Sequence, residues 1–263
     1  MDTLLERRVR DEVALVGSFS MPVSFAFTER SGGVSKPPYT SLNLGAHVGD
    51  DLDAVYENRR RVLRAFNAFD YIDNLLVPNQ IHSDKVSIVS SSDKTYILKK
   101  RQEIAIGTDA IVCTVPHVPI MLCFADCVPV VLVTSKGFAV VHSGWRGTFN
   151  RISSKAAHIL LEQTHQNPSD LSVYIGPHIL GDEYEVSPEL IEKFSARFGI
   201  IKSADNRLLD LSACIIESLV DMGVSTCSIH DAHLSTMRLN SRFFSYRCEN
   251  GMTGRHAAIA IMR

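Results

Sequence analysis

The sequence lacks the features that mark membrane-spanning, secreted and nucleic-acid-binding proteins. No stretch approaches the roughly 18 apolar residues that a membrane-spanning helix needs, and the opening segment MDTLLERR lacks the apolar core of a signal peptide. The net charge is only −2 at pH 7, so nothing in the charge balance favours nucleic acid or a membrane surface as a partner. Six cysteines without a Cys-x-x-Cys pair make no disulfide framework. We therefore expect a protein of the reducing cytoplasm.

The chain also lacks linkers and internal repeats. Its single Ser-rich patch, Ser90–Ser92, is short enough to be a turn between strands. With 263 residues, 45% of them hydrophobic and 21% charged, the composition is ordinary for a globular protein and allows a substantial core. We expect a single domain over residues 1–263, working as a monomer.

Short apolar runs rich in β-branched residues predict ten strands. They lie at Val23–Phe27, Leu75–Val77, Val86–Val89, Ala110–Cys113, Ile120–Phe124, Val128–Val133, Phe138–Val141, Leu171–Ile175, Val224–Ile229 and Ala257–Ile261. Four helices are predicted between them: Leu52–Phe66 capped by Asp50 or Asp51, residues 148–162, one starting at Ser187-Pro188, and one capped by Asp210 that runs to Met222 before Gly223. Because strands and helices do not alternate regularly, the pattern favours an α+β sandwich over a doubly wound sheet.

Three strong ligand candidates each stand beside a strand-like run. They are His82 after Asn79-Gln80-Ile81, Cys127 between Asp126 and Val128, and His142 at the end of Phe138–Val141. A lone histidine or cysteine at such a place is most simply a buried, hydrogen-bonded residue. Two imidazoles and a thiolate together suit Zn²⁺, and three protein ligands with an open fourth position are typical of catalytic zinc. The pattern therefore predicts a metal-dependent enzyme.

The segment after His142 predicts an anion site. Ser143-Gly144-Trp145-Arg146-Gly147-Thr148 joins a strand end to a helix start, where unpaired backbone N–H groups and the helix dipole attract anions. Arg146 adds a planar fork that suits phosphate. Asp126, next to Cys127, is a candidate proton shuttle or a partner for a ligand histidine, and equally a turn residue.

Ordered motifs along nearly the whole chain resemble the laccase-domain family, also called the YfiH-type or multicopper polyphenol oxidase family. The motifs are Phe27–Ser35, Ser41–Gly45, His47–Asp50, Glu57–Arg61, Gln80–His82, Thr108–Ala110, Ala125–Pro129, His142–Gly147, Gly176-Pro177, Tyr184–Val186, Phe243–Arg247 and Thr253–Arg255. The resemblance implies a zinc-dependent purine nucleoside phosphorylase with adenosine deaminase and methylthioadenosine phosphorylase activity. It also implies a four-layer α/β/β/α sandwich with mixed sheets, related to the catalytic domain of cytotoxic necrotizing factor toxins.

The resemblance also implies roles for individual residues. His82, Cys127 and His142 match the family's metal ligands, and with Asp126 they are our candidate catalytic residues. Asn43, Arg59 and Arg146 match polar positions near the family's pocket, so we expect them to bind purine nucleosides and phosphate. The sequence departs from the family pattern at His178, which follows Gly176-Pro177, near Ser235, and at Cys248, which follows Arg247. These departures bear on the pocket rim and on substrate preference.

Three other functions are compatible with the same residues. A His₂Cys site also binds copper, and the older family name points to phenol oxidation. None of the ten histidines forms the His-x-His pair of laccase-type copper sites. Cys127 and His142 could form the nucleophile–base pair of an amide hydrolase, as in the related toxin domains, although such a pair needs no His82. The third of these functions is editing of a peptidoglycan precursor, which could use the same metal site.

Overall fold

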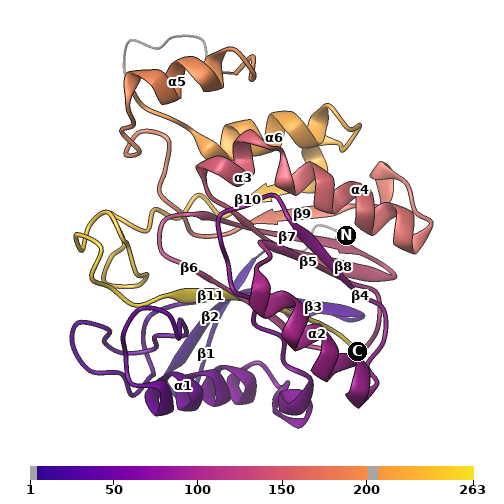
Figure 1. Cartoon of the computed structure of the whole chain (residues 1–263), viewed down its shortest axis with the longest axis vertical. Helices are drawn as coiled ribbons and strands as arrows, with labels where there is room; N and C mark the ends of the chain where they lie inside the picture. The colour runs from indigo at the N-terminus through magenta and orange to yellow at the C-terminus, as the bar shows by residue number, and fades with distance from the viewer. Residues whose placement is uncertain (1–4, 201–206) are drawn as a thin grey trace.

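Alternation of side chains along the strands divides the apolar residues among three separate cores, and this division sets the architecture. The computed structural model describes residues 5–200 and 207–263. Two sheets stack face to face, and helices cover the outer face of each (Figure 1). The predicted α/β/β/α sandwich is confirmed. Residues 1–4 of the opening segment lie outside the described residues.

The first sheet contains the C-terminal strand at an inner position. The sheet has the strand order β1-β2-β3-β11-β6, and all of its neighbouring strands are antiparallel. The strands span Glu6–Arg10 (β1), Val13–Ser18 (β2), Val23–Thr28 (β3), Ile120–Phe124 (β6) and His256–Met262 (β11). Because β11 pairs with both β3 and β6, the residues just before it are brought beside segments from the first half of the chain.

The second sheet is mixed and has the order β10-β9-β7-β8-β5-β4. The β7–β8, β5–β8 and β7–β9 pairs are antiparallel, whereas β4–β5 and β9–β10 are parallel. The strands span Val86–Val89 (β4), Ala110–Cys113 (β5), Val128–Thr134 (β7), Gly137–Ser143 (β8), Ser172–Ile175 (β9) and Ile229–Asp231 (β10). The chain passes from the first sheet to the second between β6 and β7, across Ala125–Cys127.

Helices cover the outer faces of the two sheets and one side of the space between them. Helix α1 packs on the first sheet, α4, α5 and α6 pack on the second, and α2 contributes Ile97 and Ile104 to the core between the sheets. The helices span Leu52–Ala65 (α1), Lys94–Ile106 (α2), Trp145–Phe149 (α3), Ile152–Thr164 (α4), Pro188–Ser195 (α5) and Leu211–Val220 (α6), with 3₁₀ turns at Phe69–Asn74, Pro168–Asp170 and Thr226–Ser228.

Side-chain caps explain where three of the predicted helices begin. The carboxylate of Asp51 accepts a hydrogen bond from the backbone N–H of Asp53 at 2.9 Å. The hydroxyl of Ser187 and the carboxylate of Asp210 accept equivalent bonds at the starts of α5 and α6. These caps satisfy backbone donors that the first turn leaves unpaired, and the predicted starts are confirmed. Among residues 5–200 and 207–263, no helix is both long and apolar enough to cross a bilayer.

Several elements differ from the prediction. The helix predicted over residues 148–162 is two helices, because Arg151 adopts a left-handed backbone conformation (φ 57°, ψ 41°) between α3 and α4. The strand predicted at Leu75–Val77 is only an isolated bridge at Leu76. The strand predicted at Val224–Ile229 is mostly a loop and a 3₁₀ turn, and β10 begins only at Ile229.

The prediction also missed three elements whose burial leaves no regular apolar period in the sequence. All five residues of β1 are exposed, so no apolar alternation marks that strand. Helix α2 buries only Ile97 and Ile104, so its helical period is hidden. Strand β2 is buried throughout, and a short apolar run of that kind carries no period of its own.

Candidate metal centre and pocket

Three segments far apart in the sequence bring His82, Cys127 and His142 together. Their candidate ligand atoms all lie within 4.8 Å of one another. The rings of His82 and His142 meet edge to face, with centroids 4.8 Å apart. His142 is at the end of β8, Cys127 lies on the crossing between the two sheets, and His82 lies in the loop before β4. The chain therefore joins the three predicted ligands at one end of the sandwich.

Strand register explains why Asp109 supports this cluster. Ala110 pairs with Val141 in antiparallel β5 and β8, so Asp109 stands opposite His142. The backbone N–H of His142 donates to the carbonyl of Asp109 at 2.7 Å, and Nδ1 of His142 lies 2.8 Å from Oδ1 of Asp109. This contact leaves Nε2 of His142 as the nitrogen available to the cluster.

Asp109 also fixes the loop that carries His82. Its carboxylate accepts hydrogen bonds from the backbone N–H groups of Ile81, His82 and Ser83 and from the Ser83 hydroxyl, at 2.7–3.3 Å. Burial raises the pKa of Asp109, but the His142 and Ser83 contacts outweigh burial and lower it. One buried carboxylate therefore orients two of the three candidate ligands.

The charges of the cluster favour the thiolate of Cys127. Burial alone would raise the pKa of this thiol, but His142 and His82 lower it to about 6. Burial alone would lower the pKa of His142, but the negative charges of Cys127 and Asp109 raise it to about 9. A thiolate is the form of cysteine that binds metals and attacks electrophiles. The cluster can therefore hold a cation or act as a nucleophile.

The donor set and its surroundings fit a catalytic zinc ion. Two imidazoles and one thiolate are preferred zinc ligands, and a carboxylate behind a ligand histidine is the usual support for its tautomer. In the part of the chain that the structure describes, no fourth histidine, cysteine or carboxylate joins the cluster. The ligands that are present would leave one position of a tetrahedral ion for water or substrate.

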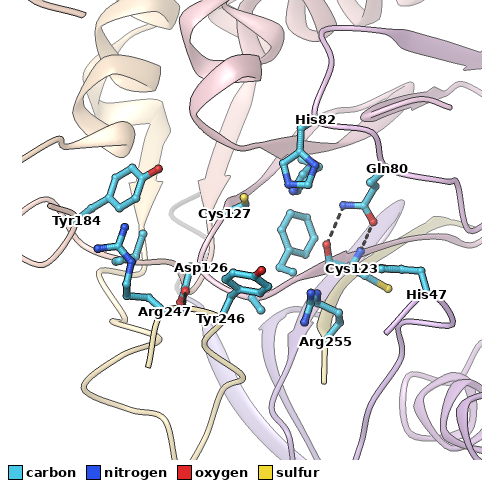
Figure 2. A pocket seen from close by; sticks show the side chains of 14 residues that line it. His47, Gln80, His82, Cys123, Asp126, Cys127, Tyr184, Tyr246, Arg247 and Arg255 are labelled. Carbon is cyan, nitrogen blue, oxygen red and sulfur yellow. Dashed lines mark hydrogen bonds between the residues drawn. The ribbon is translucent and has the colours of Figure 1, made fainter. Parts of the chain in front are cut away.

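The cluster opens into a cavity of about 460 Å³, within the range of small-molecule sites. Figure 2 shows the labelled side chains around it. The wall is formed by the cluster together with His47, Gln80, Cys123, Phe124, Ala125, Asp126, Ile179, Tyr184, Tyr246, Arg247 and Arg255. The cavity therefore combines a metal-binding corner with aromatic and cationic side chains.

Asp126 is part of this wall, and both of its carboxylate oxygens are engaged. Oδ1 accepts a hydrogen bond from the Thr236 hydroxyl, and Oδ2 accepts one from the backbone N–H of Arg247, each at 2.6 Å. Asp126 itself has a left-handed backbone, with φ of 85°. These contacts connect the crossing between the sheets to the 245–248 loop. Such a backbone and such contacts are typical of a turn residue.

The three predicted binding residues do not line the cavity. Asn43 is fully buried and holds the backbone of Gly45 and Arg255. The guanidinium of Arg59 donates two hydrogen bonds to the Leu44 carbonyl and borders a separate groove. Arg146 is exposed and lies over the Trp145 ring, 5.0 Å from its centroid. Asn43 and Arg59 act on the cavity through the loop that they support.

Two of the departures from the family pattern, His178 and Ser235, lie close together behind the cavity. His178 and Ser235 face each other in an isolated bridge, and neither lines the cavity. Nδ1 of His178 contacts the Gly176 carbonyl, and the Ser235 hydroxyl donates to Glu183, the neighbour of Tyr184. These positions support the segment that carries Tyr184.

Several residues that line the cavity had no predicted role. Tyr184, Tyr246, Arg247 and Arg255 all fall within the motifs quoted above, so a signal for them existed. What the motifs could not supply was the direction of each side chain, which depends on the position of β11 and on the loop before it.

Comparison with known proteins agrees with the fold. The family described as "Multi-copper polyphenol oxidoreductase laccase" matches residues 24–263. Purine nucleoside phosphorylase YlmD of Bacillus subtilis is 32% identical over 237 residues, which cover 87% of this chain and 84% of that protein. The crystal structure of YlmD from Geobacillus stearothermophilus has a TM-score of 0.85 at 27% identity, covering 99% of each chain.

A second solved structure, the hypothetical protein YfiH of Bacillus licheniformis, also has a TM-score of 0.85, at 29% identity, and covers 98% of this chain and 99% of its own. The sequence match and the shared fold both extend over most of the molecule. The family resemblance predicted from the motifs is thereby confirmed, and this chain belongs to the multi-copper polyphenol oxidoreductase laccase family.

Proposed function

We propose that this protein is a zinc-dependent purine nucleoside phosphorylase that also deaminates adenosine and cleaves methylthioadenosine. The observation that carries the proposal is the cluster of His82, Cys127 and His142 at the corner of a cavity of about 460 Å³ with aromatic and cationic walls. Relatives that share about a third of the sequence are named purine nucleoside phosphorylases.

In phosphorolysis a phosphate oxygen forms a bond to C1′ of the ribose while the C1′–N9 bond breaks. The purine leaves with the bonding electrons and takes up a proton, so the products are the free base and ribose 1-phosphate. The chain must therefore bind a dianion beneath the sugar, hold the base flat and exclude bulk water. Tyr184 and Tyr246 offer apolar rings for the base, and Arg247 and Arg255 offer positive charge.

Bound zinc would supply a Lewis acid and lower the pKa of coordinated water at this corner. In deamination, water replaces the amino group at C6, and adenosine and water become inosine and ammonia. The same cavity serves both reactions if the nucleoside can approach the cluster either with the C6 edge of its base or with its ribose. Methylthioadenosine differs from adenosine at the 5′ carbon, so its cleavage follows the phosphorolytic scheme.

The test is product analysis of zinc-loaded protein given adenosine, with and without phosphate, beside Cys127→Ala. Phosphate-dependent release of adenine and ribose 1-phosphate, lost in the variant, is expected. Inosine formed without phosphate is the expected deaminase product. Full phosphorolysis by metal-free His82→Ala protein would contradict the proposal, as would the absence of turnover with every purine nucleoside.

A second candidate function rests on a chain of contacts in which Cys127 meets His142 and His142 meets Asp109. A nucleophile, a base and an orienting carboxylate are arranged in this way. This arrangement would suit hydrolysis of an amide, including one in a peptidoglycan precursor. His82 has no task in such a triad. Alkylation that abolishes activity while zinc stays bound would favour this function. Phenol oxidation by copper-loaded protein is the alternative that the family name suggests. Catalytic oxidation of phenols that requires copper and is absent from zinc-only protein would favour it.

A further inference from the structure

Arg255 is a cation of the cavity wall that has no anionic partner. Among residues 5–200 and 207–263, no carboxylate forms an ion pair with it. Other arginines near this end of the sandwich are paired: Arg30 contacts Glu249, and Arg242 contacts Glu29. An unpaired, half-buried guanidinium in a cavity is poorly solvated, so an anion from solution would be attracted to it.

The guanidinium of Arg255 is held in place but keeps donors free. Nη1 donates to the carbonyls of Thr253 and Gly254, each at 2.9 Å. The backbone N–H of Arg255 donates to Oδ1 of Asn43, and its carbonyl accepts from the backbone N–H of Leu44. Nε and Nη2 have no acceptor among the described residues. These two nitrogens form the edge that pairs with two oxygens of one oxyanion.

Gly45 makes room for this arrangement. A Cβ at position 45 would lie 2.7 Å from Cγ of Arg255 and 3.4 Å from Cε1 of His47. The stem of Arg255 and the ring of His47 therefore pass the same glycine, and both side chains line the cavity. His47 forms no hydrogen bond within the described residues, so a ring nitrogen is available as a further donor.

Two other polar side chains of this wall, Gln80 and Arg247, already have protein partners. The amide of Gln80 bonds both ways with the backbone of Cys123, at 2.7 and 2.8 Å (Figure 2). Arg247 differs from Arg255 because Nη1 and Nη2 both donate to the Glu185 carbonyl. Arg255 and His47 are thus basic side chains of the wall that keep N–H donors without a protein acceptor among the described residues; the hydroxyls of Tyr184 and Tyr246 also have none, but they carry no positive charge.

We propose that Arg255, together with His47, forms the subsite for the attacking inorganic phosphate, in place of the predicted Arg146. The inference rests on the proposed phosphorolysis. It makes Arg255 a catalytic residue that binds the nucleophile, and it leaves Tyr184 and Arg247 on the wall nearer the base. Asn43 and Gly45 position Arg255 and do not contact phosphate themselves.

The experiment compares wild type, Arg255→Gln and Gly45→Ala, with Arg60→Gln as a matched loss of an exposed charge outside the cavity. The KM for phosphate should rise roughly 10- to 100-fold in Arg255→Gln, because a charge-assisted contact is lost. The KM for the nucleoside should change much less. Gly45→Ala should raise the phosphate KM in the same direction, and Arg60→Gln should leave it unchanged.

Isothermal titration with inorganic phosphate alone gives a readout that does not depend on turnover. Wild type should bind phosphate, and folded Arg255→Gln should not. Phosphorolysis by wild type with an unchanged phosphate KM in Arg255→Gln overturns the subsite and leaves the proposed function standing. Phosphate binding that requires Arg255 in a protein without phosphorolysis supports the subsite and overturns the proposed function.

Two further outcomes would also overturn the assignment. A raised phosphate KM in Arg146→Gln, with none in Arg255→Gln, would return phosphate to the start of α3. Tighter binding of adenosine 5′-monophosphate than of inorganic phosphate, abolished equally by Arg255→Gln, would make the subsite one for a substrate's own phosphate group.

Discussion

Nδ1 of His142 lies 2.8 Å from Oδ1 of Asp109, and both side chains are shielded from solvent. The same carboxylate holds the loop of His82, so a single side chain controls the orientation of two candidate ligands. A buried partner of this kind fixes the tautomer and the ring plane of a ligand histidine. The pair is therefore the first place to test whether the cluster is a metal site.

Asp109→Asn should weaken zinc binding by roughly 10- to 100-fold, because an amide neither attracts the imidazole as strongly nor accepts as many hydrogen bonds. Competition with a chromophoric chelator measures the affinity, and circular dichroism shows whether the fold is kept. Asp84→Asn is the matched control, since Asp84 is on the same loop but pairs with exposed Lys155. Equal zinc affinity in a folded Asp109→Asn protein would contradict this role.

Gly144→Ala should disturb the cluster without removing a ligand. A Cβ at position 144 would lie 3.0 Å from Sγ of Cys127 and 3.2 Å from Cδ2 of His82. We expect zinc affinity to fall by roughly tenfold, while the free energy of unfolding changes by only about 1 kcal/mol. Gly199→Ala is the control, because its added Cβ would meet nothing closer than 4.0 Å. Affinity at the wild-type level would mean that the three donors can spread apart freely.

His256 should make the fold sensitive to acid. Burial lowers the pKa of His256 to about 3, against an ordinary value of 6.5, so the unfolded chain binds a proton that the folded chain rejects. The contribution of His256 to the free energy of unfolding should therefore rise with pH between about 3 and 6.5 and be constant above that window. At the acid end the loss from His256 is on the order of 5 kcal/mol.

Urea unfolding of metal-free protein across this pH range measures the effect, and His256→Leu is the informative variant. Its curve should be flatter than that of wild type over the same window. His230→Leu serves as the comparison, because His230 is only partly buried. Parallel curves for wild type and His256→Leu would show that other groups cause the acid sensitivity.

In metal-free protein, Cys127 should be alkylated by iodoacetamide with a midpoint near pH 6. Its thiolate is present above the pKa of about 6 and is lost as pH falls through that value. Peptide mass spectrometry measures the rate at each pH, and saturating zinc should slow it. Cys113 is the internal control, since burial raises its pKa to about 12. A midpoint near that of a free thiol would show that His142 and His82 do not activate Cys127.

The cluster of candidate ligands was predictable because His82, Cys127 and His142 each stand beside an apolar run, where a side chain can face a cavity. Asp109 was not, because its contact with His142 follows from the register of β5 and β8, and the sequence does not state which strands pair. Arg146 was predicted because a glycine-bearing loop before a helix is typical of an anion site. Its guanidinium lies over the Trp145 ring, and Arg146 is not among the residues that line the cavity.

Most strands and helices were predictable from runs and periods of apolar residues, whereas the four layers were implied by the family resemblance, and one error lies where a backbone angle decides. Arg151 interrupts a pattern that otherwise continues from α3 into α4. Arg255 lay within a motif but carried no assigned role, because its free guanidinium edge depends on the two carbonyls that hold Nη1.

The position of Cys127 directly before β7 has a consequence for assembly. Strand β7 pairs with β8 through Val128 and Ser143, and β5 pairs with β8 on its other side, so the places of Cys127, His142 and Asp109 all depend on these two pairings within the second sheet. A chain in which either pairing has not formed would hold its donors apart and bind a metal weakly. Zinc would then bind only the chain with its strands paired and by mass action depopulate half-formed states, so that the ion which serves chemistry would also make the unfolding of this sheet a single concerted event.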